Sequence, residues 1–229
     1  MVTQQWVRLP SAWIRQGHLK SLRWGNSGTG SDNVAALMAL AAIAHHADQE
    51  TGIARITYDE VCEATSLSRA KLSNGLDVLE GVHVVERTFA GRSSYKLAGF
   101  NPRSDWAKFP AKSMYAARRI AAFDNFRLRQ RSELDALKLF LLFVAFRDNS
   151  TNLANISFLK IEEYTGIERA RIKAATSLLA SFEMTYIERT RSSANDYGVA
   201  NAYRVVGVEP YVHMGTRGRG MDEIDFEES

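Results

Sequence analysis

Two long stretches of the chain are apolar on most of their helical faces. Residues 34–47 are rich in alanine and leucine, and Ser31 or Asp32 precedes them as the expected N-cap. Residues 133–146 repeat the pattern in the second half of the chain. Because a helix that is apolar on most faces is usually buried, we expect both helices to form the core.

Shorter elements follow each long helix in the same order. Thr57 and Ser68 are the expected N-caps of two short helices. The first half predicts a strand at 55–57, helices at 58–65 and 68–80, and a hairpin of 82–87 with 94–97. The second half predicts a strand at 156–157, helices at 158–165 and 168–180, and a hairpin of 186–189 with 202–206.

The sequence repeats after one hundred residues. Residues 56–58 (Ile-Thr-Tyr) match 156–158 (Ile-Ser-Phe), residues 63–72 match 163–172, and the Trp and Pro of 6–10 recur in 106–110. This period is too long for a solenoid, whose units span roughly 20–50 residues. We therefore expect two domains related by internal duplication, 1–100 and 101–213, joined near 99–105, and a flexible acidic tail at 214–229. The predicted fold class is α+β, mainly α with small β-hairpins.

Charge is distributed unevenly along the chain. The formal net charge is +3, but residues 221–229 hold five acids and no bases, so residues 1–220 carry +8. A positive body indicates a polyanionic partner. The tail, which mixes acids with Ile224 and Phe226, is read as a solubilising end, or as a segment that recruits a replication or host protein.

Features typical of a membrane or secreted protein do not occur. No run of about 18 apolar residues is present, so no membrane partner is expected. No secretory signal is visible. The single cysteine, Cys62, lies in a predicted helix and reads as a small buried thiol. These features favour a cytoplasmic location.

The helix at 68–80 divides its residues between two faces. Leu67, Leu72, Leu76 and Leu79 fall on one face, which we expect to pack inward. Polar side chains lie on the other faces: Ser68, Arg69, Lys71, Ser73 and Asn74. Such a helix suits the major groove of DNA, where Arg and Lys pair with guanine and Asn with adenine.

The second half carries the same chemistry. On its matching helix the candidate DNA-binding residues are Arg169, Arg171 and Lys173, none of them expected on the core face. On the two hairpins the candidates are Arg87, Arg92, Ser94 and Lys96, then Arg189, Arg191, Ser193, Asn195 and Arg204. Residues of these types contact phosphates and the minor groove.

Residues 55–97 resemble the winged helix-turn-helix family, and 155–205 resemble it with departures. Glu168 replaces the Ser cap, and Thr176 stands in place of Leu76, so Leu178 is expected to share the inward role. The resemblance implies that the second helix of each unit enters the major groove and that the hairpin forms a wing along the backbone.

Two such units in tandem resemble plasmid replication initiators, and the openings at 6–10 and 106–110 resemble the lead-in of phage replication-protein winged helices. The resemblance implies a non-enzymatic protein of the bacterial cytoplasm or nucleoid that binds origin DNA and needs no cofactor. A transcriptional regulator, and an adaptor that uses its winged helices for protein contacts, are the alternatives. A homodimer is left open.

Three other features of the sequence indicate lesser roles. Residues 103–131 are basic and aromatic, and we expect the aromatics to pack on the second domain and two or three arginines to contact phosphates. Gly25, Gly28 and Gly30 lack the lysine of a phosphate-binding loop. His45 and His46 are expected at a solvent-exposed edge, and Tyr115 is not expected to be a strand-nicking nucleophile.

Overall fold

The computed structural model describes residues 4–25, 28–87, 93–191 and 199–208. Its helices are α1 Ala12–Arg15, α2 Thr29–His46, α3 Tyr58–Thr65, α4 Arg69–Gly81, α5 Arg131–Phe146, α6 Phe158–Thr165 and α7 Arg169–Ser181, with 3₁₀ turns η1 His18–Ser21, η2 Lys112–Met114 and η3 Ala121–Asn125. Its strands are β1 Trp6–Pro10, β2 Ile53–Arg55, β3 Val85–Arg87, β4 Ser94–Leu97, β5 Trp106–Pro110, β6 Tyr115–Ala116, β7 Arg119–Ile120, β8 Leu153–Asn155, β9 Thr185–Arg191 and β10 Val199–Val205. All pairings between these strands are antiparallel, so the fold class is α+β.

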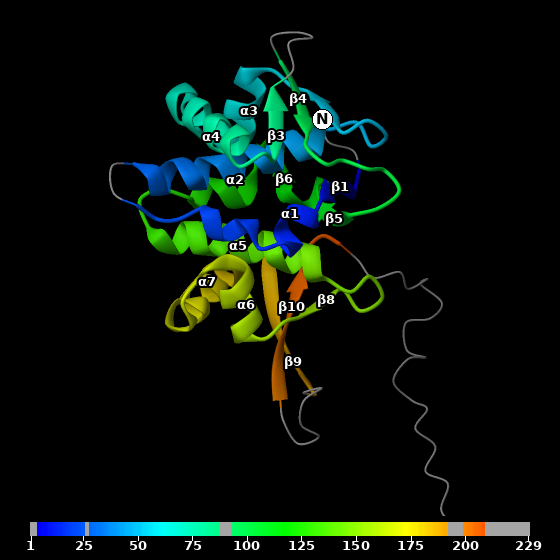
Figure 1. Ribbon diagram of the computed structural model, residues 1–229, viewed down its shortest axis with the longest axis vertical. Coiled ribbons are helices and arrows are strands. Elements are labelled where there is room, and N and C mark those ends of the chain that lie inside the picture. The colour runs from blue at the N-terminus through cyan, green and yellow to red at the C-terminus, as the bar shows by residue number, and fades with distance from the viewer. Residues whose placement is uncertain (1–3, 26–27, 88–92, 192–198, 209–229) are drawn as a thin grey trace, which may run out of the picture.

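The two halves have the same succession of elements. A long helix (α2 or α5) leads to a short strand, two short helices and a hairpin. The sheet orders correspond as well, β2-β4-β3 in the first half and β8-β10-β9 in the second. In Figure 1, α3, α4 and their hairpin lie at one end of the long axis, α6, α7 and theirs at the other, and α2 and α5 lie between them.

The boundaries of α3, α4, α6 and α7 agree with the sequence prediction to within a residue, whereas the strands β2 and β8 were placed too late. β2 ends at Arg55 rather than 57 because the Thr57 N–H donates to Glu60 in a reciprocal capping box that starts α3. The same position in the second half, Ser157, caps α6 through the Lys160 N–H. Because this residue caps the helix, it is not available to extend the strand.

The helix α2 begins earlier than predicted. Its N-cap is Gly28, with φ of 88°, so Ser31 and Asp32 lie in the first turn rather than at the cap. A Cβ atom on Gly30 would lie 2.5 Å from the ring of Trp24. The Trp24 side chain therefore covers this first turn, and the glycine-rich segment extends the helix instead of forming only a loop.

One continuous core joins the two halves. The buried side chains of α2 and α5 belong to the same hydrophobic cluster, which also takes in Val7, Leu9 and Phe109 from the two opening strands. The Phe109 ring lies 5.8 Å from that of Phe140 and 4.9 Å from the imidazole of His45. The core is thus built from both sides of the seam that the sequence predicted at 99–105.

The two openings pair with each other as strands. β1 and β5 are antiparallel, with Trp6 opposite Pro110, Arg8 opposite Lys108 and Pro10 opposite Trp106. The pairing of Trp6 with Pro110 is repeated by that of Trp106 with Pro10, one hundred positions away. The sheet therefore has a local two-fold axis, which relates the two halves. Trp6 and Trp106 stack with centroids 5.9 Å apart, and each faces a cation of the other strand.

In each half, the segment that follows the opening strand (the lead-in) packs against the opposite half. The segment with α1 and η1 packs on α5 and α6, where Arg15 donates to the carbonyl of Ala145 at 2.5 Å. The segment after β5 packs on α3, where Arg119 donates to the Ser66 hydroxyl at 2.6 Å. The prediction that the aromatics of 103–131 pack only on the second half is therefore wrong for Tyr115, which lies 5.3 Å from the ring of His45.

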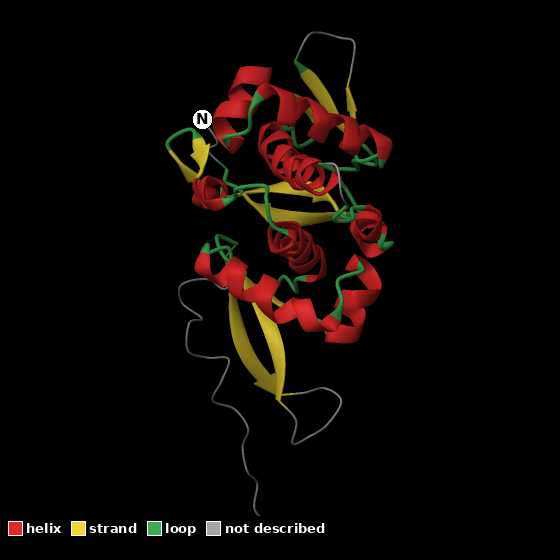
Figure 2. Cartoon of the chain, turned by 90° about the vertical axis from the view of Figure 1, so that its left-hand side faces the viewer, coloured by secondary structure: helices red, strands yellow, loops and turns green. Residues whose placement is uncertain are grey.

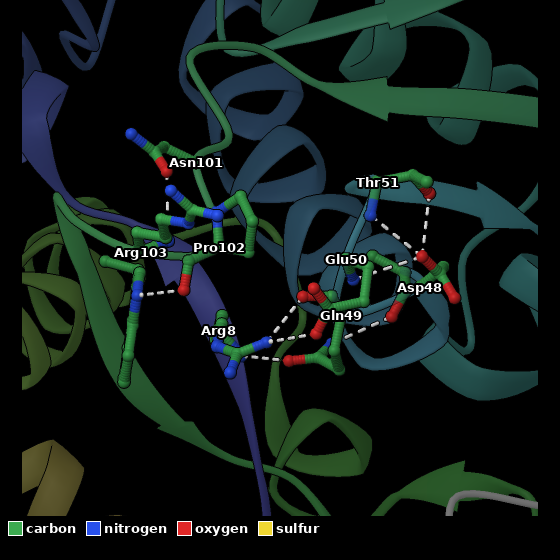
Figure 3. A network of polar contacts seen from close by, with 10 residues as sticks. Arg8, Asp48, Gln49, Glu50, Thr51, Asn101, Pro102 and Arg103 are labelled. Carbon is green, nitrogen blue, oxygen red and sulfur yellow. Dashed lines mark hydrogen bonds and ion pairs between the residues drawn. The ribbon is translucent and has the colours of Figure 1, made fainter.

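A polar network ties β1 to the turn after α2 (Figure 3). The Arg8 backbone donates to the Gln49 side chain at 2.7 Å, and its guanidinium reaches the Gln49 carbonyl and Glu50. Within the turn, Asp48 accepts from the backbone and hydroxyl of Thr51. Asp148 makes the same contacts with Thr151 in the second half. The turn is thus held by the same local chemistry in both halves.

His45 is buried, not solvent-exposed as the sequence predicted. Its Nε2 lies 2.8 Å from the Pro110 carbonyl and its Nδ1 lies 3.2 Å from the Tyr115 hydroxyl. Burial lowers the pKa of His45 to about 3 and raises that of Tyr115 above its usual range. Cys62 is half-buried in α3, where burial raises its thiol pKa. Among the described residues, no helix is long and apolar enough to cross a bilayer.

Candidate nucleic-acid interface

Each half presents a helix, a tight turn and a second helix. The turn between α3 and α4 passes through Ser66, with φ of 60°, and the turn between α6 and α7 through Gly166, with φ of 68°. Ser68 caps α4 by accepting from the Lys71 N–H. Glu168 occupies the cap position of α7 without a capping hydrogen bond and pairs with Arg171 at 2.8 Å. The carboxylate favours the helix dipole there.

The inner face of α4 is the one predicted. Leu67, Leu72, Leu76 and Leu79 are all buried, which leaves the polar side chains of α4 on its outer faces. In α7, Thr176 itself is buried, with its hydroxyl 2.9 Å from the carbonyls of Ile172 and Lys173. Leu178 is half-buried and packs against the core, so it shares the inward role with Thr176 as expected.

The two outer helices lie on one face of the molecule. Both α4 and α7 are on the left-hand side of Figure 1, which is the side that faces the viewer in Figure 2. They lie at opposite ends of the long axis, and the hairpins extend beyond them in opposite directions. The local two-fold axis accounts for this placement.

The cations of α4 are paired with acids of their own half. Arg69 contacts Asp59 at 2.5 Å and lies 5.9 Å from the centre of the Tyr58 ring. Lys71 contacts both Asp32, at 2.7 Å, and the Ser31 hydroxyl. Such pairs leave little net positive charge on this surface.

The neighbouring polar groups are engaged in the same way. The Asn74 amide donates to Asp32 at 3.2 Å. Arg87, at the base of the hairpin, pairs with Asp77 and, at 3.2 Å, with Glu80. Ser73 is half-buried. A duplex would have to compete with these carboxylates for every α4 cation that it contacts.

The helix α7 is different, because it presents two exposed cations. Arg169 and Lys173 are exposed and form no ion pair with any described residue. Arg171, between them, is half-buried and held by Asp135 at 3.0 Å as well as by Glu168. It therefore has a structural role that the sequence did not indicate, since Asp135 is buried and needs a partner.

The hairpin candidates are placed only in part. Lys96 and Arg189 are exposed, Ser94 is half-buried, and Arg204 pairs with Glu188, whose pKa that guanidinium lowers. The remaining hairpin candidates lie outside the described residues, in the case of Arg191 through its side chain: Arg92, Arg191, Ser193 and Asn195. The acidic tail also lies outside them.

The arginines of 103–131 divide into two groups. Arg118 pairs with Glu63 of α3 at 3.6 Å. Arg119 pairs with Asp124 of its own segment at 2.7 Å and donates to Ser66, so both arginines hold the lead-in on the first half. Arg103, Arg127, Arg129 and Arg131 are exposed. These four exposed arginines remain the candidates for the two or three phosphate contacts that the sequence predicts in this segment.

Sequence reasoning missed a set of cations that only the fold brings together. Lys20, Arg23 and Lys138 meet Arg131 and Arg171 around one hollow beside α7. The signal was present for Lys138, a charged residue inside the long and mainly apolar helix α5. Nothing in the sequence indicated that residues near position 20 lie beside it.

No group of three metal-ligating side chains gathers anywhere in the described residues. A scan against models of known protein families finds none that matches this chain, and a search of curated proteins finds no match either.

Proposed function

We propose that the two halves are tandem winged helix-turn-helix units and that the protein binds duplex DNA, with origin recognition by a plasmid or other mobile element as its role. The observation that carries this proposal is the placement of α4 and α7 on one face. Successive major grooves on one side of B-DNA lie roughly 34–36 Å apart, and a two-fold pair of reading helices fits such a repeat.

Within this proposal α7 is the main reader. Its exposed Arg169 and Lys173 offer charge that no described carboxylate neutralises, whereas the α4 cations are paired. Arg189 and Lys96 on the hairpins are exposed and would meet the backbone on either side. An operator-binding regulator would use the same surface.

The test compares binding of a random duplex to the wild-type protein and to an Arg169→Ala/Lys173→Ala variant. If six to ten phosphates are contacted, affinity should fall roughly 10³–10⁵-fold between 50 and 200 mM salt. The double variant should bind more weakly and show a salt slope smaller by about two. Arg171 is left in place, because its removal would strand the buried Asp135 carboxylate.

Selection of bound duplexes from a random library would then give the target sequence, and its genomic position would separate the two roles. Several copies of the target site at an origin support initiation, and a site across a promoter supports regulation. No binding to any duplex at low salt would contradict the proposal. It would favour an adaptor, a second candidate to which the acid-paired surface of α4 already lends support.

A further inference from the structure

A cationic hollow lies where the first half's lead-in meets the second half. Its walls come from η1 and the residues after it, the first turns of α5, and the turn that leads into α7 with the first turn of that helix. Ten residues line it, five of them basic and two acidic: Lys20, Leu22, Arg23, Trp24, Arg131, Asp135, Lys138, Gly166, Glu168 and Arg171. The positive charge therefore exceeds what the carboxylates of the hollow can neutralise.

Both carboxylates of the hollow form ion pairs with the same cation. Asp135 and Glu168 both pair with Arg171, at 3.0 and 2.8 Å. The other four cations form no ion pair with any residue that the structure describes: Lys20, Arg23, Arg131 and Lys138. Four positive side chains around one hollow therefore lack an anionic partner.

Among these four cations, Lys138 is the one whose burial destabilises the folded protein most. It is only 4% exposed, and its Nζ donates to the Leu22 carbonyl at 2.9 Å. Burial, together with the neighbouring Arg171, Arg131 and Arg23, lowers its pKa to about 8 against the opposing effect of Asp135. A buried ammonium surrounded by guanidinium groups destabilises the protein unless an anion accompanies it.

The core helix itself does not require a charge at this position. At the matching position of the first half, Met38 stands for Lys138, and both side chains are buried. The same place in the core helix thus carries an apolar side chain in one half and a cation in the other. The difference points to a ligand at the second site only.

We propose that this hollow binds a phosphate group. Guanidinium groups bind phosphate oxygens in pairs, and an ammonium adds a point charge. The phosphate belongs either to the backbone of a duplex seated on α7 or to a separate phosphate-bearing molecule. The site does not depend on the proposed DNA binding, because free pyrophosphate alone can test it.

The test is calorimetric titration of the full chain with pyrophosphate at low ionic strength. The variant is Lys138→Met, which the first half shows to be compatible with this fold. We expect the variant to lose at least about tenfold in affinity, the value of one charge-assisted contact. Lys112→Met, the same change at an exposed residue of η2, should bind as the wild type does. Arg23→Phe gives a second variant of the hollow.

Proton linkage assigns the contact to Lys138. At pH 8 a bound anion raises the pKa of this ammonium, so the protein should take up as much as about half a proton. Titration with sulfate, which does not itself titrate there, in buffers of different ionisation enthalpy measures this uptake. The charged groups facing Lys138 are Asp135 and Arg131 of α5, Arg171 and Glu168 of α7, and Lys20 and Arg23 of the lead-in. Loss of uptake in Lys138→Met identifies the titrating group among them.

A competition experiment with duplex DNA distinguishes a backbone phosphate from the phosphate of a separate molecule. If duplex DNA displaces pyrophosphate and Lys138→Met weakens both, the site holds a backbone phosphate. If pyrophosphate stays bound beside the duplex, or if duplex does not bind at all, the site serves a separate molecule. The proposal is overturned if the folded wild-type protein binds no pyrophosphate, or if Lys138→Met, folded by circular dichroism, binds it equally and with the same proton uptake.

Discussion

At the residue scale, close packing sets what α4 tolerates. A Cβ atom on Gly75 would lie 2.8 Å from the Ala36 nitrogen, on the backbone of α2, whereas a Cβ on Gly81 would meet nothing within 4 Å. The matching residue of the second half is Ala175, whose Cβ is accommodated in a buried place. The first half thus packs its outer helix against its core helix more closely.

Gly75→Ala should therefore destabilise the protein although alanine favours helices. Overpacking costs about 1–3 kcal/mol, against a gain in helix propensity of at most about 1 kcal/mol. Urea unfolding should show a net loss in the free energy of unfolding. Gly81→Ala, on the same helix, is the control and should be neutral or slightly stabilising. Equal effects of the two changes would refute the close approach.

His45 is the residue whose burial matters most to pH dependence. Its pKa is lowered to about 3 in the folded protein from about 6.5 in the unfolded chain. Between these values the unfolded chain binds a proton that the folded protein does not, so stability is present above pH 6.5 and is lost as pH falls towards 3.

His45→Gln keeps a donor for the Pro110 carbonyl and removes this titration. From pH 6 to pH 4 the wild-type free energy of unfolding should fall faster than that of the variant, by about 1.4 kcal/mol per pH unit. Urea titrations at several pH values give both slopes. The exposed His18→Gln is the control for loss of a histidine. Parallel slopes in wild type and His45→Gln would show that His45 is not buried as a neutral group.

At the element scale, α4 and α7 occupy equivalent places in the fold but differ in the electrostatic potential of their surfaces. Arg69 is held by Asp59 and Arg87 by Asp77, while Arg169 and Lys173 meet no described acid. Ion pairs at exposed positions contribute only about 0–1 kcal/mol to stability. Their larger consequence here is to lower the positive potential of the α4 surface.

Asp59→Asn with Asp77→Asn should release Arg69 and leave Arg87 with Glu80 as its one described acidic partner. The double variant should therefore bind a random duplex more tightly, with a steeper salt dependence. Fluorescence anisotropy over a salt series measures both. Glu162→Gln with Glu163→Gln on α6 removes the same charge where no described ion pair is broken. If this control raises affinity as much, net charge alone explains the effect and α4 has no part in it.

At the scale of the whole molecule, the halves depend on each other. β1 pairs with β5, and each lead-in packs on the opposite half. Cutting the chain at position 100 would expose Val7 and Leu9 on one fragment and Phe109 on the other, all buried in the intact protein. Apolar area of this kind contributes about 25 cal/mol per Å².

We therefore expect the full chain to unfold in a single cooperative transition. Fragments 1–100 and 101–229 should each lack the near-ultraviolet circular dichroism of packed aromatics and regain it when mixed. The stacked Trp6 and Trp106 make this signal sensitive to reassembly. A fragment 1–100 that folds alone, or two separate thermal transitions, would show independent domains joined by a linker.

The sequence by itself determined the helices and some of their caps. The long apolar runs of α2 and α5, the periodicity of α4 and α7, and the capping residues Thr57 and Ser68 act within a few neighbouring positions, so they can be read from the chain. The Gly28 cap of α2 could not be read in this way. The inward face of α4 followed from the same period. The candidate cations could be named in this way, but only as residue types on an outer face.

Only the tertiary structure decided which of those cations carry a free charge and which residues meet across the halves. Arg171 with Asp135, His45 with Pro110, and Lys138 with Leu22 are separated by 36, 65 and 116 positions. A local pattern contains no information about such partners, because an ion pair or a buried donor depends on which distant segment the packing brings beside it.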